Sequence, residues 1–376
     1  MLDLNEIRVE IDGIDRQLVE LFEARMKLTK EVAEYKIETG KKVLDTKREK
    51  EKLESVKALV KNPENVHAID DLFSQIMANS RKNQYMLLEK MGQTLREPYE
   101  AIDSIDKVNC KVVYQGVPGA YAYKAMRQFF GKDVNNFNVP TWRDAMEAVK
   151  TGKADYAVLP IENSTTGIVA GVYDLLQEYD NYIIAETYVK INHALLGLPG
   201  ADIDKVTTVY SHAQGLMQCD HFLDKHKDWK RISQANTALA AKMILEENDP
   251  RHVAIASEEA GEVYGLEVLK EGISDLANNT TRFVIVTNTR KFVKNANKMS
   301  IVFETANETG TLYNLLSHII YNGLNMNKIE SRPIEGKQWE FRFFVDFEGN
   351  IDDPRVMNAL RGIEEEAKSI KLLGNY

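Results

Sequence analysis

Cysteine is scarce in this chain of 376 residues, which contains only Cys110 and Cys219. Two cysteines cannot form the disulfide framework of a small secreted domain, so we expect a reducing, cytoplasmic environment. The sequence also lacks an apolar run long enough to span a membrane. Its first residues are acidic and amphipathic, without the apolar core of a signal peptide. These absences predict a protein with no membrane partner.

Basic charge is not in excess either. The chain has 48 Lys and Arg against 57 Asp and Glu, a net charge of −9, which disfavours nucleic-acid partners. Its seven histidines show no spacing typical of metal ligands, so we predict no metal. The segment VYQGVPGAYAY carries Gly116 and Gly119 but lacks the third glycine of a dinucleotide fingerprint, so no cofactor is predicted.

Residues 1–92 carry the pattern of an all-helical module. Apolar residues recur at steps of three and four from Leu4 to Tyr35, which predicts one long helix that ends at Gly40. A second helix is expected from about Asp45, and Pro63 separates it from a third that fades near Gly92. Residues 93–108 then resemble a linker.

Polar residues interrupt the apolar stripes of this module. Arg25 and Ser80 occupy stripe positions, where a cation is costly unless it is paired or binds an anion. Lys36 follows on the same helix face, roughly 16 Å from Arg25, so the two cations can bracket a small dianion. Arg8 lies about 25 Å before Arg25 and is rotated away from it. Arg8 is therefore either a surface charge or part of a site on a partner chain.

The segments IRVEIDGIDRQLVELFEARMKLTKEVAEYK, LDTKREKEKL and LFSQIMANSRKNQ together resemble the all-helical chorismate mutase family. The resemblance implies an intertwined homodimer that rearranges chorismate to prephenate by positioning and preorganised charge. In that family, arginines and a lysine bind the substrate carboxylates. The resemblance implies that Lys36 and Gln84 approach the ether oxygen and that Glu49 holds the hydroxyl. The implied site consists of Arg8, Arg25, Lys36, Asp45, Arg48, Glu49, Ser80 and Gln84.

Residues 109–290 alternate between strand and helix patterns, which predicts an α/β module with a parallel sheet covered on both sides. Helices are expected to begin after capping residues. These capping residues are Thr141 with Asp144, Ser211 with Gln214, Asn236 and Ser257. A buried strand should end at Pro160, because proline cannot donate to a sheet.

Two polar segments of this module permit two interpretations each. Glu162–Gly167 crowds Asn163 and Ser164 beside an expected helix start, where they serve as a helix cap or bind an anion. Arg282 precedes an apolar strand, where it either pairs with a surface acid or faces a cleft. The number of polar helix openings favours a cleft between two α/β lobes.

The segments YQGVPGAYAY, LPIENSTTGIV, SHAQGLMQC, NTALAA, AIASEEAGEVYGLEVL and NNTTRF resemble, in this order, the prephenate dehydratase family. The resemblance implies a two-lobed fold of the periplasmic-binding-protein type, which converts prephenate to phenylpyruvate, water and carbon dioxide. Thr281 matches the family's essential threonine, and we interpret it as an oriented hydrogen-bond donor. Substrate contacts are predicted for Asn163, Ser164, Gln214 and Arg282.

Residues 297–376 read as strand-helix-strand-strand-helix-strand, the order of a ferredoxin-like sandwich. The segments KIESRPIEG and WEFRFFVDFEG resemble the ACT domain of prephenate dehydratases, which binds phenylalanine at a loop after the first strand and at an ESRP turn. The matching positions are Glu308, Thr309, Gly310, Thr311, Leu312, Glu330, Ser331, Arg332 and Pro333.

We therefore predict a bifunctional enzyme of phenylalanine biosynthesis, in which one module makes prephenate, the next consumes it and the third senses phenylalanine. A mutase fused to an arogenate dehydratase is one alternative. A two-lobed amino-acid-binding sensor without dehydratase activity is another.

Overall fold

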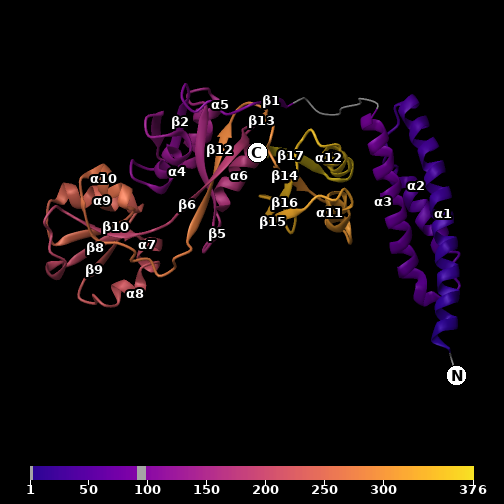
Figure 1. Cartoon of the computed structure of the whole chain (residues 1–376), viewed down its shortest axis with the longest axis horizontal. Helices are drawn as coiled ribbons and strands as arrows, with labels where there is room; N and C mark the ends of the chain where they lie inside the picture. Colours follow the sequence, from indigo (N-terminus) through magenta and orange to yellow (C-terminus); the bar gives the residue numbers. More distant parts are fainter. Residues whose placement is uncertain (1–2, 91–98) are drawn as a thin grey trace. The chain divides into compact units, whose positions relative to one another are not determined.

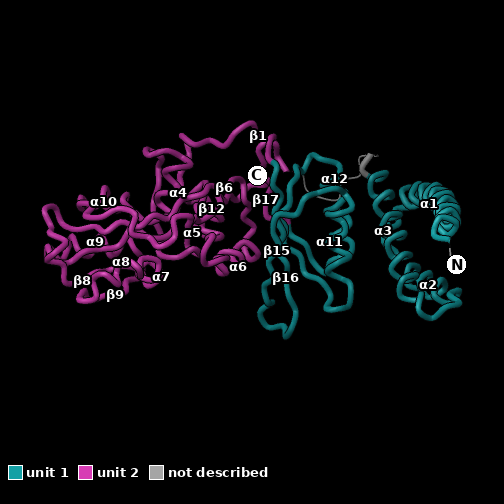
Figure 2. Tube along the Cα trace, turned by 60° about the horizontal axis from the view of Figure 1, so that its bottom comes forward, with its two compact units in different colours: residues 1–98, 297–371 teal, residues 99–296, 372–376 magenta. Residues whose placement is uncertain are grey.

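The computed structural model describes residues 3–90 and 99–376. These residues form two compact units, one of residues 1–98 with 297–371 and one of residues 99–296 with 372–376 (Figure 2). Each unit is described by itself. The end of the third predicted helix near Gly92 and residues 93–98 of the predicted linker lie outside the described residues. The three-module division stays a prediction.

The first unit begins with the three predicted helices. They are α1 (Leu4–Thr39), α2 (Thr46–Lys57) and α3 (Val66–Lys90), with a short 3-10 turn at Pro63–Asn65 before α3. Gly40 ends α1 with a φ of 65°, and α2 begins directly after Asp45, as the sequence predicts. The Asp45 side chain also caps α2. α3 packs against both α1 and α2 (Figure 1).

The same unit also contains the C-terminal elements. In chain order these are β14 (Lys298–Glu304), α11 (Thr311–Tyr321), β15 (Met326–Pro333), β16 (Phe341–Glu348), α12 (Pro354–Glu366) and β17 (Ser369–Asn375), whose last residues belong to the second unit. β16 pairs antiparallel with β14 and with β15. The predicted element order is confirmed. α11 and α12 pack together, and α12 also packs against α3.

The second unit is built around two sheets. The first contains β2 (Lys111–Gln115), β3 (Asn135–Val139), β4 (Tyr156–Asn163), β5 (Gly167–Ile168), β6 (Tyr182–Lys190) and β12 (Thr280–Thr287). Its helices are α4 (Tyr121–Phe130), α5 (Trp142–Lys150) and α6 (Ala170–Glu178). A separate pair joins β1 (Glu100–Ile102), within the predicted linker, to β13 (Lys291–Val293).

The second sheet contains β7 (Ala194–Gly197), β8 (Thr208–His212), β9 (Lys230–Gln234), β10 (His252–Ala256) and β11 (Glu267–Lys270). A 3-10 turn at Ile203–Lys205 precedes β8, and the helices are α7 (Ala213–Met217), α8 (Asp220–Leu223), α9 (Thr237–Glu247) and α10 (Glu258–Tyr264). Successive residues of β10 enter different cores: Ala254 packs with α9, and Ile255 packs with the α8 side. Each sheet with its helices forms one lobe.

Both sheets are mixed, so the predicted parallel sheet is only partly confirmed. β2 lies parallel to β3 and β4, but β12 runs antiparallel to β4 and β6. In the second sheet β8 lies parallel to β9 and β10, while β7 is antiparallel to β10 and β11. The chain leaves the first lobe after β6 and returns in β12. The returning strand β12 runs in the opposite direction to its neighbours β4 and β6.

Three local predictions around the polar segments are wrong. β4 continues through Pro160, because a register shift in its pairing with β12 forms a bulge there, where proline is tolerated. Asn163 and the residues after it form the turn of the β4–β5 hairpin, and α6 begins only at Ala170. Ser211 does not cap α7, because its buried hydroxyl donates to the Ile255 carbonyl and His212 takes the capping position. The caps at Thr141, Asn236 and Ser257 are confirmed.

Candidate functional sites

The helical part of the first unit encloses a cleft of about 270 Å³. Its walls come from α1, α2, α3 and the loop that joins α1 to α2. Seven of the eight residues predicted for this module line it, namely Arg25, Lys36, Asp45, Arg48, Glu49, Ser80 and Gln84. The eighth, Arg8, is exposed on α1 and does not line the cleft. The structure thus brings together every predicted residue except the one placed too far along α1.

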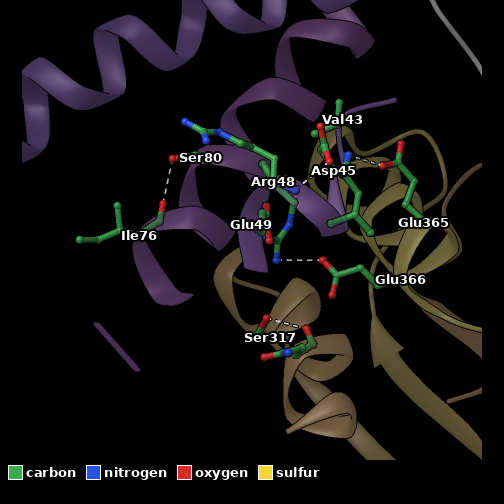
Figure 3. Close-up of polar contacts among 12 residues, drawn as sticks. Val43, Asp45, Arg48, Glu49, Ile76, Ser80, Ser317, Glu365 and Glu366 are labelled. Atoms are coloured by element: carbon green, nitrogen blue, oxygen red, sulfur yellow. Dashed lines mark hydrogen bonds and ion pairs between the residues drawn. The ribbon is translucent and has the colours of Figure 1, made fainter. Parts of the chain in front are cut away.

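Hydrogen bonds hold several of these side chains before any ligand binds. Arg25 Nη1 donates to Ser80 Oγ at 2.5 Å. The same hydroxyl donates to the Ile76 carbonyl at 2.8 Å, as Figure 3 shows. Gln84 Nε2 donates to the Ser80 carbonyl at 3.3 Å. Because α3 carries both Ser80 and Gln84, one rigid helix orients the cation and the amide of this wall.

Lys36 reaches the same cleft from the end of α1. Its ammonium donates to the Val43 carbonyl at 2.5 Å. Burial lowers the pKa of Lys36 below its ordinary value of 10.5, although the nearby carboxylates of Asp45 and Glu49 oppose this shift. The cleft therefore concentrates cations that water solvates poorly, which is what the binding of a small dianion requires.

The second unit brings together the polar segments that sequence places 118 residues apart. Thr281 of β12 pairs with Asn163 of β4, and Asn163 Nδ2 donates to Thr281 Oγ1 at 2.9 Å. The same amide donates to Asn279 Oδ1 at 2.7 Å. A hydroxyl that accepts a hydrogen bond from Asn163 still has its own proton to donate. This geometry fits an oriented donor at Thr281.

Ser164 makes hydrogen bonds within the chain, and its substrate contact stays a prediction. Its hydroxyl donates to the Asn278 carbonyl at 3.1 Å and accepts from the backbone of Thr280 at 3.0 Å. These bonds fasten the β4–β5 turn to the segment that enters β12. Ser164 therefore supports the position of Thr281 from the neighbouring turn.

A cleft of about 240 Å³ lies between the two lobes of this unit. Thr165, Thr166 and Asn279 line it from the first lobe, and Gln214 and Gln218 line it from α7 and the residue that follows it. The predicted residue Gln214 therefore reaches this cleft. Thr281, Asn163, Ser164 and Arg282 do not line it, although Asn279 links it to Asn163 and hence to Thr281.

Arg282 points to the opposite face of the sheet from Thr281, because successive strand residues alternate. Its Nε donates to Glu186 Oε2 at 2.7 Å, and its Nη2 donates to the Tyr376 hydroxyl at 2.7 Å. A longer ion pair of 3.5 Å joins it to Glu162. The structure thus favours the ion-pair interpretation of Arg282 over the predicted substrate contact.

Comparison with known proteins identifies the family of the helical part and of the two-lobed unit. Residues 7–85 match the family model of chorismate mutase type II, and residues 112–291 match that of prephenate dehydratase. The bifunctional chorismate mutase/prephenate dehydratase of Enterobacter agglomerans is 32% identical over 98% of this chain and 95% of its own length. The chain belongs to this bifunctional family. A relative of the same description from Aquifex aeolicus is 33% identical over 100% of this chain and 98% of its own.

Among solved structures, a prephenate dehydratase from Arthrobacter aurescens in complex with L-Phe is similar to this chain. It has a TM-score of 0.66 and 28% identity, over 71% of this chain and 89% of its own. This bifunctional chain therefore combines a helical chorismate mutase domain with a prephenate dehydratase domain. No helix within residues 3–90 or 99–376 is long and apolar enough to cross a membrane.

The sequence reasoning missed Arg81, which also lines the mutase cleft. Its guanidinium contacts both carboxylate oxygens of Glu49, at 2.7 and 2.5 Å. Arg81 follows Met77 and precedes Tyr85 by four residues each, and all three are buried on α3. These three residues form a second buried stripe on α3, which was the sequence signal for an ion pair at Arg81. A cation within an apolar stripe must be paired.

The sequence reasoning also missed the contacts of Tyr121 and His193, at the point where the dehydratase domain passes from its first lobe to its second. The Tyr121 hydroxyl lies 3.0 Å from the Asn192 carbonyl and 3.0 Å from His193 Nδ1. His193 Nε2 lies 2.9 Å from Oε1 of Gln218, which lines the cleft between the lobes. Burial lowers the pKa of His193, which favours the neutral ring near pH 7. Tyr121 thus holds the segment in which the chain passes from the first lobe to the second, next to the cleft between the lobes.

The predicted phenylalanine positions fall on two elements of the first unit. Glu308–Leu312 spans the loop after β14 and the start of α11, where Gly310 has a φ of 81°. The Thr311 hydroxyl donates to the carbonyls of Ala306 and Glu308. Glu330–Pro333 forms the last residues of β15 rather than a turn, because Ser331, Arg332 and Pro333 pair with β16.

Proposed function

We propose that the helical cleft binds chorismate through Arg25, Lys36 and Arg48 and rearranges it to prephenate. The observation that carries this proposal is the convergence of seven predicted residues on one cleft. The rearrangement is unimolecular and needs no nucleophile, so fixed cations and donors are sufficient. Lys36 and Gln84 stabilise charge on the ether oxygen as its bond breaks, Glu49 holds the substrate hydroxyl, and Asp45 and Ser80 fix the surrounding side chains.

A homodimer supplies the remaining cation. Many large apolar side chains of α1 are exposed, as a helix that packs against a second copy requires. They include Leu4, Val9, Ile11, Ile14, Leu18, Val19, Leu21, Leu28, Val32 and Tyr35. Arg8 lies among them on the same helix, so it completes the mutase site of the partner subunit.

Mixed dimers of Arg8→Ala and Arg25→Ala chains are expected to regain mutase activity. One of the two sites in such a dimer combines the intact Arg25 of one chain with the intact Arg8 of the other. A statistical mixture should therefore reach about a quarter of wild-type activity, because half of the dimers carry one intact site. The measurement is chorismate consumption after the inactive variants are unfolded together and refolded. No recovery in a mixture shown to contain mixed dimers contradicts the shared site.

In the dehydratase domain, Thr281 assists the departure of the prephenate hydroxyl as carbon dioxide leaves. Asn163 orients the Thr281 hydroxyl, Ser164 fastens the turn that carries Asn163, and Gln214 contacts the substrate from the second lobe. The two crossings between the lobes support a periplasmic-binding-protein type of fold. Arogenate, with an amino group in place of the keto group, is the alternative substrate of this cleft.

Phenylalanine regulates the chain at the C-terminal elements, which we assign to the ACT family. The confirmed strand and helix order supports this assignment, and the Arthrobacter aurescens relative was solved with L-Phe. We also assign the protein to the cytoplasm. Both cysteines are free and buried, and burial raises the pKa of Cys110 to about 11 and of Cys219 to about 12, so neither is a reactive thiolate near pH 7.

Gly310→Ala is expected to weaken phenylalanine inhibition about fivefold, because an alanine at positive φ strains the proposed binding loop by about 1 kcal/mol. The phenylalanine concentration that halves prephenate turnover measures this effect. Gly323→Ala is the matched control, since Gly323 follows the other end of α11 with a φ of 67° and equally open space around it. Equal shifts in both variants would count against a binding loop at Gly310.

A further inference from the structure

Arg81 joins the mutase cleft to the C-terminal helix α12. Its Nη1 contacts both oxygens of Glu49, and its Nη2 lies 2.9 Å from Glu366 Oε1. Figure 3 labels these two acids, Glu49 and Glu366. The side chain of Arg81 is 9% exposed and that of Glu366 is 12% exposed. A planar guanidinium held by two carboxylates has little freedom to rotate. Arg81 therefore fixes the orientation of the Glu49 carboxylate.

Glu366 is itself anchored by the helix that packs against α12. His318 Nε2 on α11 lies 3.0 Å from Glu366 Oε1, and His318 is buried. Gly362 makes room for the imidazole ring, since a Cβ at this position would lie 2.3 Å from His318 Nδ1. The position of the carboxylate is thus set by two packed helices rather than by a free helix end.

Glu49 needs this constraint because cations surround it in the cleft. Arg25 and Lys36 both interact electrostatically with Glu49. A Glu49 side chain without its Arg81 partner would turn toward these cations, which are needed for the substrate carboxylates. Holding Glu49 on Arg81 keeps the cations available for the ligand and the carboxylate available for the hydroxyl.

The neighbouring residue of α12 braces the other side of the same site. Glu365 Oε2 accepts hydrogen bonds from the Leu44 backbone at 2.8 Å and from the Tyr85 hydroxyl at 2.7 Å. Leu44 follows Val43, whose carbonyl holds the Lys36 ammonium. The last turn of α12 therefore contacts the surroundings of both Glu49 and Lys36.

We propose that Arg81 and Glu366 are positioning residues for the mutase reaction, which act through Glu49 and make α12 part of the mutase site. This inference rests on the proposed role of Glu49 in binding the substrate hydroxyl. It implies that the mutase activity depends on the C-terminal elements even though every side chain assigned to contact chorismate belongs to α1, α2, α3 or their connecting loop.

The test introduces Glu366→Gln into the full chain and into a Glu49→Gln chain, and measures mutase kcat and KM. In the otherwise native chain, kcat/KM should fall about tenfold, because Glu49 loses its fixed orientation. In the Glu49→Gln chain the same change should matter less than twofold, since the side chain through which it acts is already altered. Arg81→Lys keeps the positive charge but loses the planar guanidinium that contacts both Glu49 and Glu366. It should likewise lower kcat/KM in the native chain and have little effect in the Glu49→Gln chain.

Three further measurements decide how the result is interpreted. Glu364→Gln, an exposed acid in the same helix turn, should leave mutase kinetics unchanged, and prephenate turnover should be normal in every variant. If Glu366→Gln lowered mutase kcat/KM equally in the native and the Glu49→Gln chains, or left it unchanged in the native chain, the positioning role would be overturned. The proposed mutase site would not be affected by either result. If Glu49→Gln itself left the mutase rate unchanged, the proposed site would fail, and the positioning role with it.

Discussion

Thr281→Ala is expected to lower prephenate turnover by about 10³-fold while the mutase rate stays at its native value. The hydroxyl of Thr281 accepts from Asn163 and so keeps its own proton available for the proposed donation to the departing hydroxyl group. Alanine removes this donor without disturbing the backbone pairing of β12 with β4 and β6. The measurement is phenylpyruvate formation from prephenate at saturating substrate.

Two variants separate this chemistry from a local loss of structure. Thr281→Ser keeps the hydroxyl and should retain most of the activity. Thr280→Ala changes the preceding threonine, whose backbone bond to Ser164 survives the substitution, and should be close to native. Undiminished phenylpyruvate formation in Thr281→Ala would contradict the catalytic role of Thr281 and leave it with only a structural role.

Lys36→Ala is expected to lower chorismate turnover by about 10³-fold or more and to leave prephenate turnover intact. Lys36 is the half-buried cation proposed to face the breaking ether bond, and alanine removes its charge from the cleft. Gln84→Ala should cause a loss of the same kind, because its amide is proposed to approach the same oxygen. Both effects are measured as mutase kcat/KM.

Lys30→Ala provides the matched control, because Lys30 is an exposed lysine on the same helix, α1. It should leave both activities unchanged. A Lys36→Ala chain that loses prephenate turnover as well would show that the two active sites do not work independently. Retained mutase activity in Lys36→Ala would remove the helical cleft as the site of the reaction.

Local sequence signals predicted part of the mutase cleft, and the resemblance to the chorismate mutase family supplied the roles of Glu49 and Gln84. Gly40 and Asp45 mark the end of α1 and the start of α2 through backbone preferences that depend on few neighbours. The helical period then places Arg25 and Lys36 on one face, and the rise per residue separates Arg8 from both. The sequence could therefore predict which cations share a cleft within one chain.

The remaining features depend on contacts between distant segments. Arg81 bonds to Glu49, 32 residues away, and pairs with Glu366 of another element, which no local pattern reveals. Pro160 stays inside β4 because of a bulge that only the register with β12 defines. Arg282 was predictable in part, because a strand that directs Thr281 to one face must direct Arg282 to the other.

One chain is expected to convert chorismate to phenylpyruvate through two separate sites. The most direct test supplies the purified native chain with chorismate alone and follows chorismate, prephenate and phenylpyruvate over time. Chorismate is expected to disappear and phenylpyruvate to form, with prephenate as a transient intermediate. Chorismate left unconsumed, or prephenate that accumulates without phenylpyruvate, would contradict this expectation.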